Sequence, residues 1–121
     1  VERIERRGGQ RVTRIMVSGG GSQSNAICQI TADLFDRPVV RSETYETSGL
    51  GAAMNGFVGL GVYATHAEAA EHMVHWDATF LPRPEAARIY HELFTRVYKR
   101  IYPALKPLYQ QIQGITGYPD I

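Results

Sequence analysis

The sequence predicts an α/β fold in which short strands are covered by helices, and two observations carry this prediction. Residues 11–17 alternate between polar and apolar side chains and stop at three glycines, and residues 24–35 then show an apolar pattern with helical spacing. Pro38 is followed by the extended stretch 39–41, and proline is tolerated at the first residue of a strand. The first third of the chain is therefore predicted to be a strand, helix, strand unit.

Length and composition are those of one compact domain, which we expect to cover residues 1–121. The chain has 121 residues, of which 44% are hydrophobic and 21% charged, enough for one core and too few for two ordinary domains. It opens on Val1 rather than Met, and residues 1–11 lack the apolar run of a secretory signal or a membrane span. We therefore expect no membrane partner and a segment cut from a longer protein.

The net charge and the cysteine content indicate which class of partner and which cellular compartment to expect. The formal net charge is only +1, and the basic residues are spread without an RNA-reading motif, which argues against nucleic acid. The single cysteine, Cys28, cannot form an internal disulfide, which fits a reducing compartment such as the cytoplasm. Its neighbours Ile27 and Ile30 indicate that Cys28 is a small buried side chain rather than a nucleophile.

The middle of the chain predicts three helices from local patterns. The apolar stripe of the helix at 24–35 consists of Ile27, Ile30 and Leu34, widened by Ala26 and Phe35. A second helix is predicted over 48–60, and its four glycines indicate burial in close backbone contact with a neighbour, since each costs a helix about 0.8–1.0 kcal/mol. Thr65 and Glu68 form a capping box for a short helix that ends near Trp76.

The last long pattern predicts a packed helix that contains prolines. Its apolar face is spaced by threes and fours and carries Tyr90, Phe94, Val97, Ile101, Leu105, Leu108 and Ile112. Pro103 and Pro107 each remove an internal hydrogen bond, so we expect a kink or break near Tyr102. The tyrosines on or beside this face favour core or interdomain packing over stacking on a ligand.

The most informative residues form the run from Ser18 to Asn25, between the first strand and the first helix. Glycines at the carboxyl end of a strand let a ligand approach the main chain, and the amides and dipole of the following helix favour polar or anionic ligands. A nucleotide suits that geometry. The alternative is a plain turn in which Ser22 or Ser24 caps the helix, although three consecutive glycines exceed what such a turn needs.

Two nucleotide motifs can be compared with this turn. A Walker loop is excluded, because no lysine and hydroxyl pair follows the glycines. The dinucleotide fingerprint is closer: Gly19, Gly21 and Ser24 fit all but its last glycine, and Glu43 ends the second strand about where a ribose-binding acid belongs. A dinucleotide fold needs several more parallel strands, however, and everything after Glu43 is predicted to be helix.

Four pieces of the sequence, in the correct order, resemble the adenosine-side segment of FGGY carbohydrate kinases, a branch of the actin-like, ribonuclease-H-like ATPases. They are the glycine triplet with Ser24, the helix bearing Gln29 and Asp33, the Arg-Pro-Val piece, and residues 46–53 (ETSGLGAA). A fifth piece before a tyrosine-rich helix is similar to the family's tail and consists of Phe80, Pro82, Pro84 and Glu85. The resemblance covers roughly residues 11–109 and indicates the C-terminal, adenosine-binding part of the second domain.

The resemblance also implies which residues meet the nucleotide. In such kinases the glycine-rich turn lies against the adenine and ribose, which places Gly20 and Gly21 on ATP or ADP, with Ser24 reaching toward the base. Residues 11–61 would be the nucleotide-binding part, and 62–121 a helical tail. The start of the glycine-rich helix, at Glu46, Thr47 and Ser48, is at least as well interpreted as a helix cap, so we assign none of the three to the nucleotide.

For the intact enzyme, the resemblance implies phosphorylation of a sugar or polyol hydroxyl with ATP and Mg²⁺. Phosphoryl transfer needs a carboxylate, a magnesium ion and donors around the phosphates. The family's phosphate-binding turns and catalytic aspartate come from upstream segments, and the sugar contacts come mostly from the missing lobe. Asp33 is interpreted as a helix-surface acid or the partner of a nearby amide, so no catalytic residue is assigned and the chain alone is expected to be inactive.

Other hypotheses stay open beside this one. His66, His72 and His75, with nearby glutamates, could suggest a metal site, but surface helices often carry such residues and we assign no metal. The alternative from another class is a non-catalytic module whose long tyrosine-bearing helix binds a partner or itself, and a homo-oligomer is compatible with either reading. A dinucleotide-binding fragment ranks third.

Overall fold

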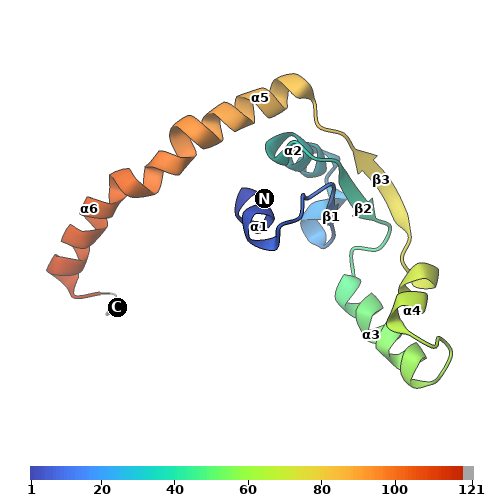
Figure 1. Cartoon of the computed structure of the whole chain (residues 1–121). Coiled ribbons are helices and arrows are strands. Elements are labelled where there is room, and N and C mark those ends of the chain that lie inside the picture. The colour runs from blue at the N-terminus through green and yellow to red at the C-terminus, as the bar shows by residue number, and fades with distance from the viewer. Residues whose placement is uncertain (119–121) are drawn as a thin grey trace. The chain divides into compact units, whose positions relative to one another are not determined.

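The computed structural model describes residues 1–118, which fall into two compact units, Val1–Ala87 and the residues from Arg88 onward. The first unit holds a three-stranded sheet with helices, and the second is helical (Figure 1). The end of the predicted helical tail, 119–121, lies outside the described residues. None of the helices within 1–118 is both long and apolar enough to cross a membrane.

The sheet joins β1 (Ile15–Val17), β2 (Val39–Ser42) and β3 (Trp76–Phe80) in that order (Figure 1). β1 and β2 are parallel, and helix α2 (Asn25–Phe35) connects them, so the predicted strand, helix, strand unit is confirmed. β1 is shorter than the predicted 11–17, because only its last three residues pair with β2.

Strand β3 corrects the prediction that only helix follows Glu43. It pairs antiparallel with β2 and places Phe80 opposite Val39. Its sequence WDATF alternates apolar and polar side chains, which is the period of a strand. The short helix predicted to end near Trp76 therefore stops earlier, and Trp76 begins a strand that needs β2 beside it to form.

Helix α2 packs on the sheet and supplies most of the small core. Cys28 and Ala32 are buried together with Val39 of β2, and the partly buried residues around them are Ile15, Val17 and Phe80. The prediction that Cys28 is buried is confirmed, at 1% exposure. The core therefore lies between α2 and the strands on which the glycine-rich turn is built.

The buried face of α2 differs from the predicted apolar stripe. Ile27, Ile30 and Leu34 are 52%, 46% and 45% exposed. The buried positions are smaller or paired residues: Cys28, Ala32 and Asp33. Small side chains let the helix axis approach β2 closely, and this close approach decides which face is covered. The predicted helix is therefore confirmed, and its apolar stripe is about half exposed in the described chain.

Helix α1 (Glu2–Gly8) is tied to the segment that enters β1 through one carboxylate. Glu5 Oε1 accepts from Val12 N at 2.9 Å and from Arg37 Nη2 at 3.5 Å. Arg37 Nε also donates to Val12 O at 2.7 Å. Arg37, which follows α2, therefore anchors the chain ahead of β1.

Helices α3 (Thr47–Gly59) and α4 (His66–Met73) contact each other. In the connection between them, Tyr63 stacks on His72 with ring centroids 5.4 Å apart and meets Phe57 edge-on at 6.1 Å. No residue of α3 is buried, so the prediction of a buried helix is wrong for this chain. A Cβ added to any of the four α3 glycines would meet nothing within 4 Å, so no described neighbour requires them.

Helix α4 begins at the predicted cap. Thr65 Oγ1 accepts from Glu68 N at 3.2 Å, which confirms the cap. The Glu68 carboxylate bonds back to Ala64 N at 2.7 Å, one residue before the position that a capping box uses.

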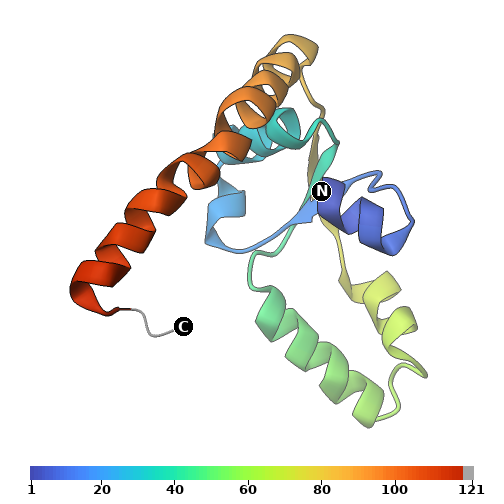
Figure 2. The ribbon, with the colours of Figure 1, turned by 60° about the vertical axis from the view of Figure 1, so that its left-hand side comes forward.

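The helical segment runs through α5 (Pro84–Leu93), the π-helical turn η2 (Phe94–Tyr98) and α6 (Lys99–Thr116), and can be followed from orange to red in Figure 2. α6 continues through Pro103 and Pro107, so the helix has no break near Tyr102, and a kink there stays a prediction. The irregularity lies one turn earlier, at η2, since a π-turn is a common way to absorb a disturbed helical hydrogen-bond ladder.

The predicted apolar face of the last helix has no covering among the described residues. No residue of η2 or α6 is buried, and Ile101, Leu108 and Ile112 are 46%, 52% and 52% exposed. Tyr98 and Tyr102 are more exposed still, at 67% and 66%. Tyr98 and Tyr102 therefore do not belong to a core within residues 1–118, and interdomain packing of the tyrosines stays a prediction.

Candidate functional site

The glycine-rich turn lies at the carboxyl edge of the parallel strands β1 and β2. Its middle is a short 3₁₀ turn, η1 (Gly20–Gln23), and Ser22 Oγ closes it by donating to Gly19 O at 2.7 Å. Gly19 has φ +85°, a conformation that other residues rarely adopt. Gly19 is therefore required by the shape of the turn itself.

Gly20 and Gly21 are not explained in the same way. Both are exposed, and neither has a positive φ. A Cβ added to either residue would meet no heavy atom within 4 Å. The described chain therefore does not need glycine at these two positions, and the open space beside them is available to a molecule that is not part of it.

Ser24 has one structural task that the structure makes visible. It is the N-cap of α2, and its Oγ accepts from Ile27 N at 3.4 Å. The cap reading of Ser24 is thus supported, while Ser22 closes the turn rather than capping the helix. A hydroxyl that accepts at a cap still has a proton to donate. The turn brings Gly20, Gly21 and Ser24 together within five residues.

Arg41 of β2 holds this turn from the neighbouring strand. Its Nη1 donates to Ser22 O at 3.1 Å and to Asn25 Oδ1 at 2.8 Å. Its Nε donates to Asp77 Oδ2 of β3 at 2.7 Å, and its guanidinium lies over the Phe80 ring at 5.5 Å. Sequence reasoning missed Arg41, because its partners are 16 to 36 residues away in the chain.

Asp33 lies behind the turn, on the buried side of α2, and is engaged by four hydrogen bonds. It accepts from Arg83 N at 2.7 Å, from Arg83 Nε and Nη2 at 3.0 and 2.6 Å, and from Gln29 Nε2 at 3.0 Å. Gln29 Nε2 also donates to Leu81 O at 2.9 Å. Asp33 is therefore not a helix-surface acid; its second interpretation, a partner of a nearby amide, is confirmed.

Two opposing influences set the pKa of Asp33. Burial by itself raises the pKa of this carboxyl group, but the Arg83 side chain, the Arg83 backbone amide and the Gln29 amide lower it further than burial raises it. The net result is a pKa below the ordinary value of 3.8. Asp33 is thus an ionised structural group, unsuited to accept a proton near neutral pH.

The start of α3 lies at the same sheet edge as the turn. Ser18 Oγ and Thr47 Oγ1 are 3.3 Å apart and share a hydrogen bond. Glu46 occupies the N-cap position without a side-chain cap bond, and its backbone N donates to Thr44 Oγ1 at 3.3 Å. The interpretation of this segment as the cap of the helix is therefore confirmed for the position of Glu46, although its side chain makes no cap bond, and Thr47 contacts the glycine-rich turn.

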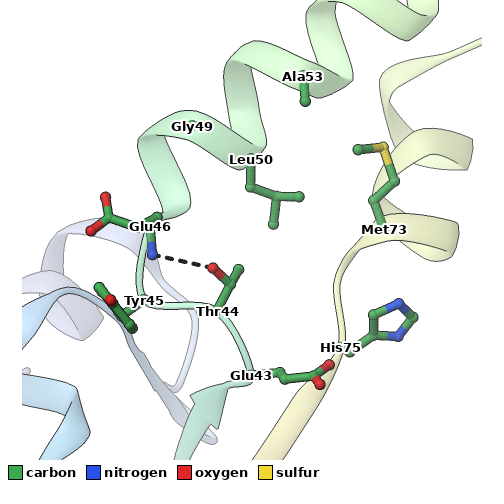
Figure 3. Close-up of a pocket in the computed structure, with 9 residues that line it drawn as sticks. All are labelled: Glu43, Thr44, Tyr45, Glu46, Gly49, Leu50, Ala53, Met73 and His75. Atoms are coloured by element: carbon green, nitrogen blue, oxygen red, sulfur yellow. Dashed lines mark hydrogen bonds between the residues drawn. The ribbon is translucent and has the colours of Figure 1, made fainter.

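A pocket of about 620 Å³ opens beside the start of α3 (Figure 3). Its lining consists of Glu43, Thr44, Tyr45, Glu46, Gly49, Leu50, Ala53, Met73 and His75. In Figure 3, Leu50 points from α3 and Met73 from α4 into the space between these helices. Glu43, on which the dinucleotide hypothesis depends, lines this pocket, and the lining contains no residue of the glycine-rich turn.

The three histidines make separate contacts. His66 Nε2 lies 2.9 Å from Asn55 Oδ1, His72 stacks on Tyr63, and His75 lines the pocket. Within residues 1–118, no three His, Cys, Asp or Glu side chains are grouped as metal ligands. These contacts account for His66 and His72 without an ion.

Together these features define a mixed α/β segment whose glycine-rich turn opens at the carboxyl edge of a parallel strand pair. Residues 1–60 match the family model described as the FGGY family of carbohydrate kinases, C-terminal domain. The chain belongs to this family, as the resemblance in its sequence predicts, and the predicted α/β fold class is confirmed.

Relatives extend the match over most of the chain. It is 34% identical over 110 residues to the uncharacterized sugar kinase YgcE of Escherichia coli strain K12, covering 88% of this chain and 22% of that protein. It is 32% identical over 103 residues to the xylulose kinase of Bacillus subtilis strain 168, covering 85% of this chain and 20% of that protein.

Solved structures agree with this assignment. The crystal structure of ligand-bound xylulose kinase from Lactobacillus acidophilus matches with a TM-score of 0.75 at 25% identity, over 85% of this chain and 21% of that chain. The gluconate kinase from the same organism matches with a TM-score of 0.74. The chain thus spans about a fifth of the length of the relatives it matches.

Proposed function

We propose that the chain is the C-terminal, nucleotide-binding part of an ATP-dependent carbohydrate kinase that phosphorylates a sugar or polyol hydroxyl. One observation carries this proposal: in a member of the FGGY family, Gly20 and Gly21 border open space, and nothing in the described chain requires glycine at these two positions. A ligand that needs close approach to the main chain explains glycine at both positions.

The adenosine part of ATP or ADP fits this turn physically. Exposed main chain at Gly20 and Gly21 gives a flat base and ribose a surface without side chains. The amide groups at the start of α2 favour a polar ligand, and the Ser24 hydroxyl has a proton to donate to an acceptor on the base. We therefore assign Gly20, Gly21 and Ser24 to the nucleotide.

The chain's own carboxylates do not supply the reaction. Asp33 is held by Arg83 and Gln29, and Asp77 by Arg41, so we assign neither as the base that positions the sugar hydroxyl. With no ligand cluster among residues 1–118, we assign no residue to Mg²⁺. We infer that phosphates, Mg²⁺ and sugar are bound by the remainder of a cytoplasmic kinase and that the chain alone is inactive.

The same proposal divides the chain into a nucleotide-binding part and a tail. We propose residues 11–61 as the nucleotide-binding part and 62–121 as a tail that supports it. A second candidate function, an interaction module, is favoured by the exposed apolar residues of α6, among them Ile101, Leu108 and Ile112. In the kinase proposal these residues pack against the remainder of the enzyme.

An amide NMR titration of the 121-residue chain tests the proposal. ADP is added to millimolar concentration and the signals of residues 19–25 are followed, with NAD as the comparison ligand. Saturable shifts with ADP are expected in this turn. Larger shifts with NAD that include Glu43 would instead favour dinucleotide binding.

Two glycine variants sharpen the test. Gly21→Ala fills the open space beside the turn and is expected to weaken ADP binding about tenfold, which corresponds to about 1.4 kcal/mol. Gly56→Ala is the matched control, because a Cβ there also meets nothing within 4 Å but lies in α3. Equal ADP affinity in both variants, or no shift in the turn at millimolar ADP, would contradict the assignment.

A further inference from the structure

The Arg41 side chain extends from β2 and joins β3 to the glycine-rich turn. β1 ends at Val17, which lies opposite Arg41 in the parallel register, so the Arg41 side chain starts beside the point where the turn leaves the sheet. From there it reaches Ser22 O at 3.1 Å and Asn25 Oδ1 at 2.8 Å, on both sides of Ser24.

The opposite edge of the guanidinium is held from β3. Asp77 Oδ2 accepts from Arg41 Nε at 2.7 Å, and the Phe80 ring lies under the guanidinium at 5.5 Å. The Arg41 side chain is only 16% exposed. The Arg41 guanidinium is planar, and its contacts with the Asp77 carboxylate and the Phe80 ring leave it few alternative orientations. Its Nη1 therefore points to the turn in a fixed direction.

The turn has few other restraints from outside itself. Ser22 O also accepts from the buried Cys28 thiol at 3.2 Å, and Ser18 meets Thr47 at 3.3 Å. The remaining bonds are local to the turn: Ser22 Oγ and Ser22 N donate to Gly19 O at 2.7 and 3.1 Å, and Ser24 N donates to Gly21 O at 3.3 Å. A glycine triplet loses much conformational freedom on ordering, so a rigid external donor matters more here than in an ordinary turn.

We propose that Arg41, oriented by Asp77, is a positioning residue that fixes the glycine-rich turn in the shape that accepts a nucleotide. This inference rests on the proposed function for its ligand, but its structural half, control of the turn by Arg41, stands without it. Arg41 acts through Ser22 and Asn25 and is assigned no contact with the ligand.

Arg37 provides a matched control in the same unit. It too donates its Nε at 2.7 Å to a partner, Val12 O, and pairs with a carboxylate, that of Glu5. Its Nη1 donates to Asp36 O at 2.7 Å, and none of its hydrogen bonds within residues 1–118 reaches a residue of the turn. Arg41→Met and Arg37→Met therefore remove similar numbers of hydrogen bonds, and only the first releases the turn.

The test measures two quantities in the full 121-residue chain. The first is amide hydrogen exchange of Ser22 and Ser24 without ligand, with Ala69 in α4 as the internal reference. The second is the ADP dissociation constant from the NMR titration. Relative to Ala69, Arg41→Met is expected to exchange the amides of Ser22 and Ser24 about tenfold faster than wild type does. Its ADP dissociation constant is expected to be about tenfold higher than that of wild type.

Two milder variants keep the test decisive if Arg41→Met does not fold. Arg41→Lys keeps the charge without the planar fork, so most of the increase in exchange rate and in ADP dissociation constant seen with Arg41→Met is expected. Asp77→Asn is expected to increase both quantities by about two- to threefold. Arg37→Met should leave both quantities within about twofold of wild type.

The outcomes separate this inference from the proposed function. If the amide hydrogens of Ser22 and Ser24 exchange no faster in Arg41→Met or Arg41→Lys than in Arg37→Met, the inference is overturned. If the wild-type chain does not bind ADP, the nucleotide proposal fails, and the exchange comparison alone still decides whether Arg41 holds the turn.

Discussion

Asp33 and Arg83 are 50 residues apart in the chain, yet the Asp33 carboxylate accepts both the backbone amide of Arg83 and its guanidinium. The Asp33 side chain is fully buried, whereas the Arg83 side chain is 64% exposed. The pair joins α2 to the segment that leaves β3, and Gln29 strengthens the joint by bonding both Asp33 and Leu81 O. This joint connects the helix behind the glycine-rich turn to the start of α5.

Asp33→Asn should destabilise the chain by about 1.5–3 kcal/mol, the range for hydrogen bonds to a charged group. The amide removes the charge that Arg83 approaches and replaces one acceptor oxygen with a donor that faces other donors. Urea unfolding followed by circular dichroism measures the change. Glu92→Gln is the control: its carboxylate pairs with Arg88 on the helix surface and is 47% exposed, so the loss should stay below about 0.5 kcal/mol. Equal losses would contradict the structural role of Asp33.

The lowered pKa of Asp33 predicts the pH range in which this stability disappears. Because the folded-state pKa lies below the unfolded value, near 3.8, the contribution is fully present above that value. It is lost as the pH falls through the folded-state pKa. Urea midpoints measured from neutral pH down to about pH 2 should therefore fall more steeply below about pH 4 in wild type than in Asp33→Asn. Parallel curves would rule out a lowered pKa.

Neighbouring glycines of the turn should respond differently to alanine. Gly19→Ala forces an L side chain to φ +85°, with an expected cost of about 1–3 kcal/mol. Gly20→Ala meets open space without a positive φ, so the free energy of unfolding should stay within about 0.5 kcal/mol or rise slightly. Thermal unfolding of both variants checks this contrast. A large loss of stability in Gly20→Ala would mean that the turn itself, and not a ligand, requires that glycine.

Exposed apolar residues of α6 predict self-association of the isolated chain. Ile101 and Ile112 lie on the uncovered face, and burying them between copies removes apolar surface from water. Light scattering should give an apparent mass that rises with concentration, and Ile101→Gln with Ile112→Gln should lower it. Lys106→Gln in the same helix is the control and should leave the association unchanged. A concentration-independent monomer mass would contradict this prediction.

Local patterns predicted the parts of the fold that depend on neighbouring residues. The cap at Thr65, the strand at 39–41 and the position of the glycine-rich turn each follow from a few adjacent side chains, and each is confirmed. The assignment of Gly20, Gly21 and Ser24 to a nucleotide came from resemblance and stays a prediction.

Features that depend on distant partners could not be read in this way. β3 has a strand pattern only five residues long, and it forms because β2 offers it an edge. The roles of Asp33 and Arg41 are set by partners 50 and 36 residues away. The apolar stripe of α2 does not indicate which residues are buried, because Cys28, Ala32 and Asp33 are covered by strands and loops distant in sequence.

The contacts of Arg41 also bear on how members of this family can exchange parts. A graft that moves residues 18–25 of this chain into a relative would carry the Ser22 carbonyl and the Asn25 side-chain amide that Arg41 contacts, but leave behind the arginine, its acid and its ring. Such a chimera would inherit the glycines and lose the support that orders them. Positions 25, 41, 77 and 80 therefore form a set that should be transplanted together.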